Sequence, residues 1–154
     1  LSFEAVQGNA SAQYNLGLMY KDGIGVDQDI DEALGWFTLG SDNGHILSKY
    51  ALGLLYYHGK GTRINFNKAM NLFLDASFMG HPASQINIGN MYYFGQGVGK
   101  NFPKAHMWWS IAKEKGVEAA FSNLIMIESK MSESQIVEAQ KLYNNCQKTT
   151  LPKC

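Results

Sequence analysis

The chain has 154 residues, of which 45% are hydrophobic and 12% aromatic, so it has enough apolar material for one domain with a continuous core. Thirteen basic and thirteen acidic residues cancel, so the composition offers no basic surface of the kind that neutralises nucleic-acid phosphates. No apolar run approaches the roughly 18 to 20 residues needed to span a bilayer. We therefore expect a chain that binds no nucleic acid and does not span a membrane.

The sequence repeats with a period of 36 residues, the distance from Gly8 to Gly44 (44 − 8). A fixed period of roughly 20 to 50 residues indicates an array in which each unit buries its apolar face against the next. The same step separates the members of these sets: Gly8, Gly44, Gly80 and Gly116; Leu16-Gly17, Leu52-Gly53 and Ile88-Gly89; Tyr20, Tyr56 and Tyr92; Ala33, Ala69 and Ala105.

The period divides the chain into consecutive segments. Residues 1–8 match the end of a repeat, so we expect further repeats upstream of Leu1. Three whole repeats then follow without a gap, at 9–44, 45–80 and 81–116. Residues 117–154 are predicted to form a degenerate repeat and a C-terminal capping helix.

Each repeat predicts two helices. In the first, about residues 10–22, Ala12, Leu16 and Tyr20 fall on one face, and Gly17 beside that face allows a second helix to approach closely. A Gly-x-Gly pair then supplies the positive φ angles that end a helix. The second helices follow the N-cap residues Asp29, Asn65 and Asn101. Their predicted buried stripe contains Ala33, Ala69, Ala105, Trp36-Phe37, Leu72-Phe73 and Trp108-Trp109.

The last segment departs from this pattern. Ala120 and Leu124 keep a first helix, but no Gly-x-Gly pair follows them. Ser132 and Gln135 have the spacing of a capping box, which predicts a helix over about 133–147. One side of that helix is apolar, as a terminal cap requires, with Ile136, Ala139, Leu142, Tyr143 and Cys146.

The repeated residues resemble the Sel1-like repeat family, a relative of the tetratricopeptide repeats. The resemblance rests on A-x-x-x-L-G-x-x-Y, then G-x-G, then K/E-A-x-x-W/L-F/W and a closing Gly. It covers residues 1–116 in register and about 117–128 in weakened form. It implies an all-α fold, a right-handed α-solenoid of antiparallel helix pairs, in a bacterial protein. It also implies an adaptor or scaffold in envelope, signalling or host-interaction processes, and it favours a periplasmic or secreted location, although the sequence itself leaves the location unknown.

In tetratricopeptide-like arrays the first helix of each pair lines a concave groove, so the resemblance places partner contacts on the side opposite Leu16. That side carries asparagines and aromatic residues, which suit a peptide backbone and large contact areas. We expect a monomer that binds a protein or peptide there, without a cofactor. The predicted partner-binding residues are Tyr14, Asn15, Leu18, Tyr50, Leu54, Tyr57, His58, Asn87, Asn90, Tyr93, Phe94 and Asn123.

We expect no catalytic residue and no metal site. We identify no Gly-x-Ser-x-Gly or Ser-x-x-Lys motif that places a serine as a nucleophile, and no histidine at helical spacing from a cysteine or carboxylate pair. Two alternatives remain open. One is a structural spacer within a longer protein. The other is a weak hydrolase or binder of cell-wall material or penicillin, an activity linked to cysteine-rich Sel1-like proteins. Those relatives have a cysteine pair in every repeat, and this chain has none in its repeats.

The two cysteines, Cys146 and Cys154, both lie near the C-terminus. They are either two free thiols in a frayed tail or a local disulfide that ties the tail to the last helix. An oxidising compartment would favour the disulfide.

Overall fold

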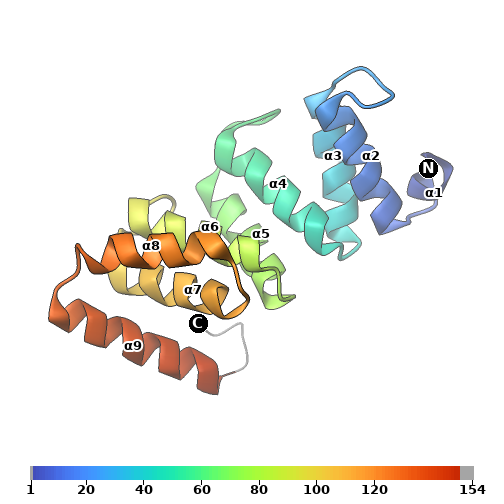
Figure 1. The fold of residues 1–154 in the computed structure, drawn as a ribbon. Coiled ribbons are helices and arrows are strands. Elements are labelled where there is room, and N and C mark those ends of the chain that lie inside the picture. Colours follow the sequence, from blue (N-terminus) through green and yellow to red (C-terminus); the bar gives the residue numbers. More distant parts are fainter. Residues whose placement is uncertain (1, 150–154) are drawn as a thin grey trace. The chain divides into compact units, whose positions relative to one another are not determined.

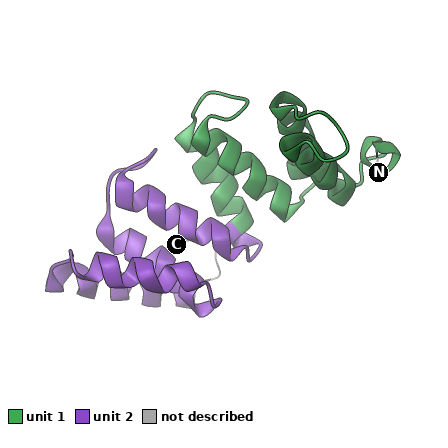
Figure 2. Cartoon of the chain, turned by 45° about the horizontal axis from the view of Figure 1, so that its top comes forward, with its two compact units in different colours: residues 1–76 green, residues 77–154 purple. Residues whose placement is uncertain are grey.

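The structure is a computed structural model that describes residues 2–149, and the regular elements among them are all α-helices (Figure 1). The chain divides into two compact units, residues 1–76 and 77–154 (Figure 2). In chain order the helices are α1 (Ser2–Val6), α2 (Ala10–Asp22), α3 (Ile30–Asp42), α4 (Ile46–His58), α5 (Phe66–Phe78), α6 (Pro82–Phe94), α7 (Phe102–Glu114), α8 (Glu118–Glu128) and α9 (Glu133–Lys148).

Local sequence determines where these helices begin and end. The second helix of each pair follows a residue whose side-chain oxygen accepts backbone N–H groups of the first turn at 2.8–3.0 Å. These residues are Asp29, Asn65 and Asn101, as predicted. The first helices α2, α4 and α6 end at glycines with φ of 67–74°, a conformation that costs a glycine little. These glycines are Gly23, Gly59 and Gly95.

Within each pair, a glycine of the first helix lies directly against an aromatic ring of the second. A Cβ atom at Gly17 would lie 2.6 Å from Cε1 of Phe37, which is closer than two carbon atoms can approach. The rings involved are 0–1% exposed. The three contacts are Gly17 with Phe37, Gly53 with Phe73, and Gly89 with Trp109.

In the first unit, α3 packs against both α2 and α4. Its Ala33 and Phe37 form one buried cluster with Leu52 and Leu55 of α4. A second cluster joins α1 to α2 and contains Ala5, Ala12 and Leu16. The core of the unit is therefore continuous from one helix pair to the next, as the period predicts.

The predicted buried stripe of the second helices is correct for its alanines, for Phe37 and Phe73, and for both tryptophans of the third repeat. Ala33, Ala69 and Ala105 are 0% exposed. Trp36 and Leu72, however, are half-buried, whereas the equivalent Trp108 is 1% exposed. The prediction for Trp36 and Leu72 was wrong because the helical period assigns a side, but the neighbouring helices decide how much of that side is covered.

In the second unit, α7 packs against α6, α8 and α9. Ala105 and Trp109 of α7 form a buried cluster with Leu124 and Ile127 of α8. The capping helix α9 lies beside α7 (Figure 1). Near its C-terminal end, the Tyr143 hydroxyl donates a hydrogen bond to Glu114 of α7.

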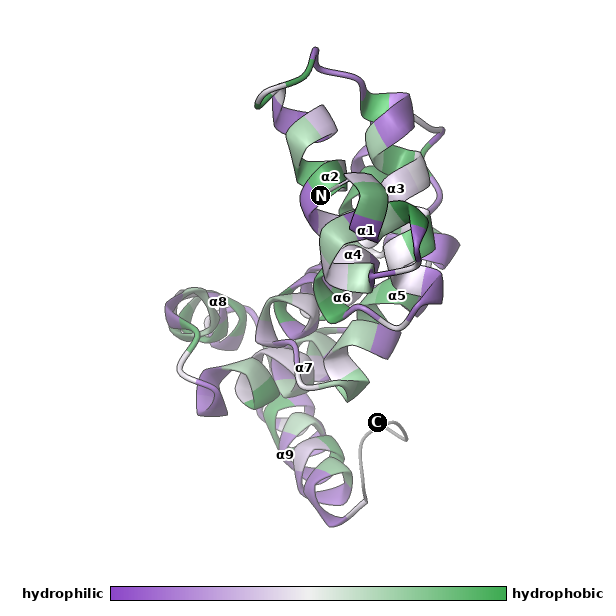
Figure 3. Cartoon of the chain, turned by 90° about the vertical axis from the view of Figure 1, so that its right-hand side faces the viewer, coloured by the Kyte–Doolittle hydropathy of each residue, from purple (hydrophilic) through white to green (hydrophobic). Residues whose placement is uncertain are grey.

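The helix α9 is amphipathic, as the sequence predicts. Hydrophobic and hydrophilic residues alternate along it in Figure 3. Ser132 and Gln135 form both hydrogen bonds of a capping box at its start. Ala139 and Cys146 are buried, with exposed fractions of 0% and 6%.

Two histidines occupy equivalent N-cap positions, His45 before α4 and His81 before α6. His45 Nδ1 accepts a hydrogen bond from the backbone N–H of Ser48 at 3.2 Å and lies 3.0 Å from the Ser48 hydroxyl. His81 Nδ1 lies 2.9 Å from the Ser84 hydroxyl. Burial lowers the pKa of both imidazoles from the ordinary value of 6.5.

We predict that Gly53→Ala lowers the free energy of unfolding by about 1–3 kcal/mol, because the added methyl group would force the Phe73 ring away. Urea denaturation followed by circular dichroism measures the change. Gly35→Ala is the matched control. Gly35 is exposed in the middle of α3, and a Cβ there meets no atom within 4 Å, so this substitution should stabilise by roughly 0.5–1 kcal/mol. A Gly53→Ala variant as stable as wild type would contradict the close contact.

We predict that the N-cap histidines make the fold acid-sensitive. Their pKa is lower in the folded chain than in the unfolded chain, so the unfolded chain takes up more protons as the pH falls through about 6.5. Stability should therefore decrease from about pH 7.5 to pH 5. The double variant His45→Asn/His81→Asn keeps a capping oxygen and cannot titrate. Its free energy of unfolding should change less with pH than that of wild type, and an unchanged pH slope would refute this role.

We predict that Cys146 forms a disulfide with Cys154, which lies outside the described residues. Protein produced in an oxidising compartment and then denatured should show no thiol before reduction and two afterwards. A loop this short constrains the unfolded chain modestly, so reduction should cost at most about 2–3 kcal/mol of stability. Two thiols per unreduced chain would show that the cysteines are free.

Candidate functional site

In the first unit, the predicted partner-binding residues lie on α2 and α4, and none of them is buried. Asn15 and His58 are exposed. Tyr14 is half-buried, with its ring centroid 5.8 Å from that of Phe37 and 5.0 Å from that of His45. The half-buried members of this set are Tyr14, Leu18, Tyr50, Leu54 and Tyr57.

The half-buried tyrosines therefore pack against the core with one part of the ring and leave the rest accessible. Tyr50 repeats the arrangement of Tyr14 one period later, 5.9 Å from Phe73. Tyr57, at the end of α4, lies edge-on to Phe66 at 5.5 Å. Such packing holds each ring in a fixed orientation at little further cost in side-chain entropy.

In the second unit, the predicted residues lie on α6 and α8. Asn87, Asn90 and Tyr93 of α6 and Asn123 of α8 are half-buried. Phe94, the last residue of α6, is 63% exposed. An aromatic side chain this exposed beside amide groups is a feature of interaction surfaces.

Tyr93 is held in place by contacts with several neighbouring side chains. Its ring stacks on Phe102 of α7, with centroids 5.3 Å apart and planes inclined by 12°. The ammonium groups of Lys130 and Lys100 lie 5.2 Å and 5.9 Å from its centroid, and Lys130 also donates a hydrogen bond to its hydroxyl. The sequence analysis missed both lysines, since neither belongs to the repeat pattern.

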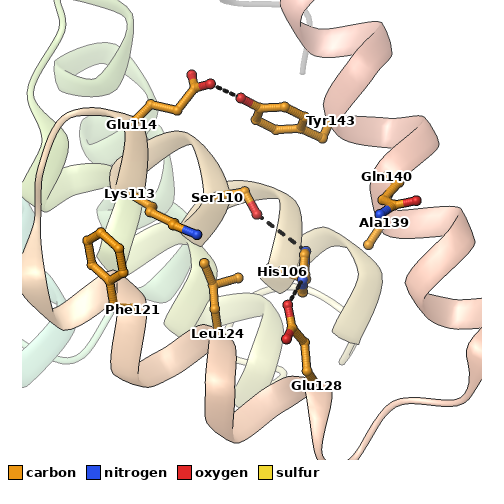
Figure 4. Close-up of a pocket in the computed structure, with 10 residues that line it drawn as sticks. All are labelled: His106, Ser110, Lys113, Glu114, Phe121, Leu124, Glu128, Ala139, Gln140 and Tyr143. Atoms are coloured by element: carbon orange, nitrogen blue, oxygen red, sulfur yellow. Dashed lines mark hydrogen bonds and ion pairs between the residues drawn. The ribbon is translucent and has the colours of Figure 1, made fainter.

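A separate cavity of about 440 Å³ lies in the second unit, between α7, α8 and α9 (Figure 4). Its lining combines apolar side chains with groups that can donate or accept hydrogen bonds. The lining residues are His106, Ser110, Lys113, Glu114, Phe121, Leu124, Glu128, Ala139, Gln140 and Tyr143.

Three polar groups in this cavity form a continuous chain of contacts (Figure 4). Glu128 Oε1 lies 2.8 Å from His106 Nε2, and His106 Nδ1 lies 3.3 Å from the Ser110 hydroxyl. A carboxylate can only accept, so in a neutral imidazole Nε2 carries the proton and donates it toward Glu128. His106 Nδ1 is then an acceptor, and the Ser110 hydroxyl donates to it.

The residues that form and surround these contacts differ in charge and in solvent exposure. His106 is buried at 9% exposure, whereas the Glu128 side chain is 49% exposed. The Lys113 ammonium lies 5.1 Å from the Phe121 ring centroid, and no carboxylate among residues 2–149 lies within ion-pair distance of it. On the opposite wall, burial and then the hydrogen bond from its hydroxyl to Glu114 raise the pKa of Tyr143.

The sequence analysis missed this cluster, although two signals were present. His106 and Ser110 stand four residues apart on one helix, a spacing that brings side chains together. Ser110 and Lys113 have the Ser-x-x-Lys spacing, and we expected no serine in such a motif. No sequence spacing indicated Glu128, because it lies on another helix, 22 positions after His106.

No group of three or more histidine, cysteine, aspartate or glutamate side chains suited to a metal ion occurs within residues 2–149. Over the same residues, no helix is long and apolar enough to cross a membrane.

The sequence and the structure of the chain were compared with those of known proteins. The Sel1 repeat family matches residues 10–45, 46–81 and 82–117. The crystal structure of a Sel1 repeat protein from Oxalobacter formigenes superposes with a TM-score of 0.72 at 30% sequence identity, covering 80% of this chain and 92% of that one.

A protective antigen present in uropathogenic Escherichia coli strains, which displays an SLR fold, superposes with a TM-score of 0.63. At 22% identity, with 97% of this chain and 40% of that chain covered, it shows the shared fold alone. No curated protein matches the sequence. With three matched repeats and nine helices in residues 2–149, the chain belongs to the Sel1 repeat family and has its all-α solenoid fold.

Proposed function

We propose that this protein is an interaction module that binds a protein or peptide segment on the faces of its first helices. Sel1 repeats generally serve as protein-interaction scaffolds. The observation that carries the proposal is the side of α6 and α8 that faces away from Ile88 and Leu124, where asparagines and Tyr93 are half-buried and Phe94 is 63% exposed. Phe94 lies edge-on to Tyr93, with ring centroids 4.9 Å apart, so the two rings form an aromatic pair that a partner can contact.

The chemistry of this surface suits an extended segment. An asparagine amide both donates and accepts, so it can pair with a peptide group of the partner. Tyr93 is already held by Phe102 and Lys130, so little side-chain entropy is lost when a partner covers it. Phe94 supplies apolar area at the end of the same helix.

The charges near Tyr93 favour an acidic residue in the bound segment. Lys100 and Lys130 both approach the Tyr93 ring, and within residues 2–149 neither ammonium forms an ion pair with a carboxylate. A carboxylate of the partner placed between them would be attracted to both. We infer a segment that pairs an acidic residue with an apolar one.

We further infer a monomeric protein of the bacterial envelope or of a secreted fraction, acting in assembly or host interaction. The bacterial sources of the similar structures support the bacterial setting. The location is a separate inference, and fractionation of the native host tests it.

We predict that peptides selected from a random display library on the intact protein bind less tightly after substitution on this surface. Asn87→Ala should weaken binding by about 1–3 kcal/mol, the cost of an unpaired buried partner group. Phe94→Ala should cost about 2 kcal/mol or more, as an exposed aromatic anchor does. Isothermal titration calorimetry measures both, and circular dichroism establishes that the variants are folded.

The controls use exposed residues of α9, a different part of the second unit. Asn144→Ala matches the amide substitution and Val137→Ala matches the apolar one. Both should leave binding unchanged. Folded Asn87→Ala and Phe94→Ala variants that bind like wild type would exclude the first-helix face, as would controls that weaken binding equally.

A further inference from the structure

We propose that the cavity between α7, α8 and α9 is an acyl-transfer site with Ser110 as its nucleophile. The contact chain from Glu128 through His106 to Ser110 opens into this cavity (Figure 4). This activity goes beyond the proposed interaction function and uses different residues.

The proton arrangement favours activation of the serine. Glu128 fixes the His106 tautomer, which leaves Nδ1 free to accept the Ser110 proton. A serine hydroxyl becomes an effective nucleophile when a neighbouring base takes its proton and a third group orients that base. The two ring nitrogens are exchanged relative to the familiar serine hydrolase arrangement, but the acceptor and donor roles are the same.

The contact is not the usual one for a serine inside a helix. A mid-helix serine commonly donates to the backbone carbonyl four residues earlier. For Ser110 that residue is His106, and here the hydroxyl lies 3.3 Å from its ring nitrogen. The ring is buried, so the base is held in place before any substrate binds.

The cavity provides the other requirements of acyl transfer. Its volume of about 440 Å³ is within the range of small-molecule sites. Phe121, Leu124 and Ala139 form an apolar wall for an acyl chain. Lys113 lines the same cavity without a carboxylate partner in residues 2–149, so its ammonium is available to stabilise an oxyanion.

The substrate class that fits is a small ester with an apolar acyl group. The Ser110 oxygen bonds to the carbonyl carbon while its proton moves to His106 Nδ1. The ester C–O bond then breaks, and the alcohol leaves with that proton. Water attacks the acyl-serine ester in the second half, giving its proton to His106 and then to the serine oxygen, and the carboxylic acid is released.

The test is covalent labelling of the full chain by an alkyl fluorophosphonate, followed by intact mass and peptide mapping. Wild type should gain one adduct, on Ser110, with fluoride as the leaving group. Ser110→Ala should gain none, while Ser122→Ala, which removes an exposed serine of α8, should label like wild type. An unlabelled wild type, or equal labelling of Ser110→Ala, would overturn the proposal.

Further variants separate chemistry from folding. His106→Gln should slow labelling by about a hundredfold or more, as loss of a general base does. Glu128 is a positioning residue, so Glu128→Gln should slow labelling about tenfold, and Glu128→Asp should recover part of the rate. Lys113→Met changes an exposed side chain and should slow hydrolysis of p-nitrophenyl butyrate without lowering the melting temperature. Labelling that is indifferent to His106 and Glu128 would show that no relay activates the serine. Because these substitutions lie outside the first-helix face, peptide binding should persist in all of them, so the two proposals fail independently.

Discussion

The close contact between a first-helix glycine and a second-helix aromatic ring is the constraint on which the rest of the fold depends. At Gly17, Gly53 and Gly89 the missing Cβ lets a buried ring lie directly against the helix backbone. Each contact sets the separation of its two helices, and the small alanines of the second helix fill the remaining space. A buried ring contributes large apolar area, so this one contact both positions and stabilises the pair.

The binding surface that we propose is a consequence of that packing. When Leu16, Leu52 and Ile88 face inward, the opposite side of each first helix is only partly covered by the pair's core. Residues there are free to vary within the repeat, and they do, from Asn15 to Ala51 to Asn87. Their partial burial against second-helix rings orients them without hiding them. In the proposed function, one helix thus contributes one side to the core and the other side to partner binding.

The C-terminal end of the chain packs differently from the repeats. A repeat array needs a terminal element that covers its last apolar face, and α9 does so along α7. Because α9 is not part of another repeat, it packs without the glycine contact and leaves a cavity beside α8. The polar chain from Glu128 to Ser110 lies in this cavity, where the repeat pattern no longer dictates the residues. The two proposed sites therefore have separate structural origins.

The sequence by itself determined most of the features that depend on neighbours along the chain or on the period, although the spacing of His106 and Ser110 was not recognised. The caps at Asp29, Asn65 and Asn101, the glycine ends of the first helices, the capping box at Ser132 and the first-helix faces are all of this kind. Only the tertiary structure decided what surrounds Tyr93 and what meets inside the cavity, since Lys130 lies 37 positions from Tyr93 and Glu128 lies 22 from His106. Periodicity states which side of a helix a residue occupies. Which side chains from other helices meet it depends on how the helices pack, and no local spacing carries that information.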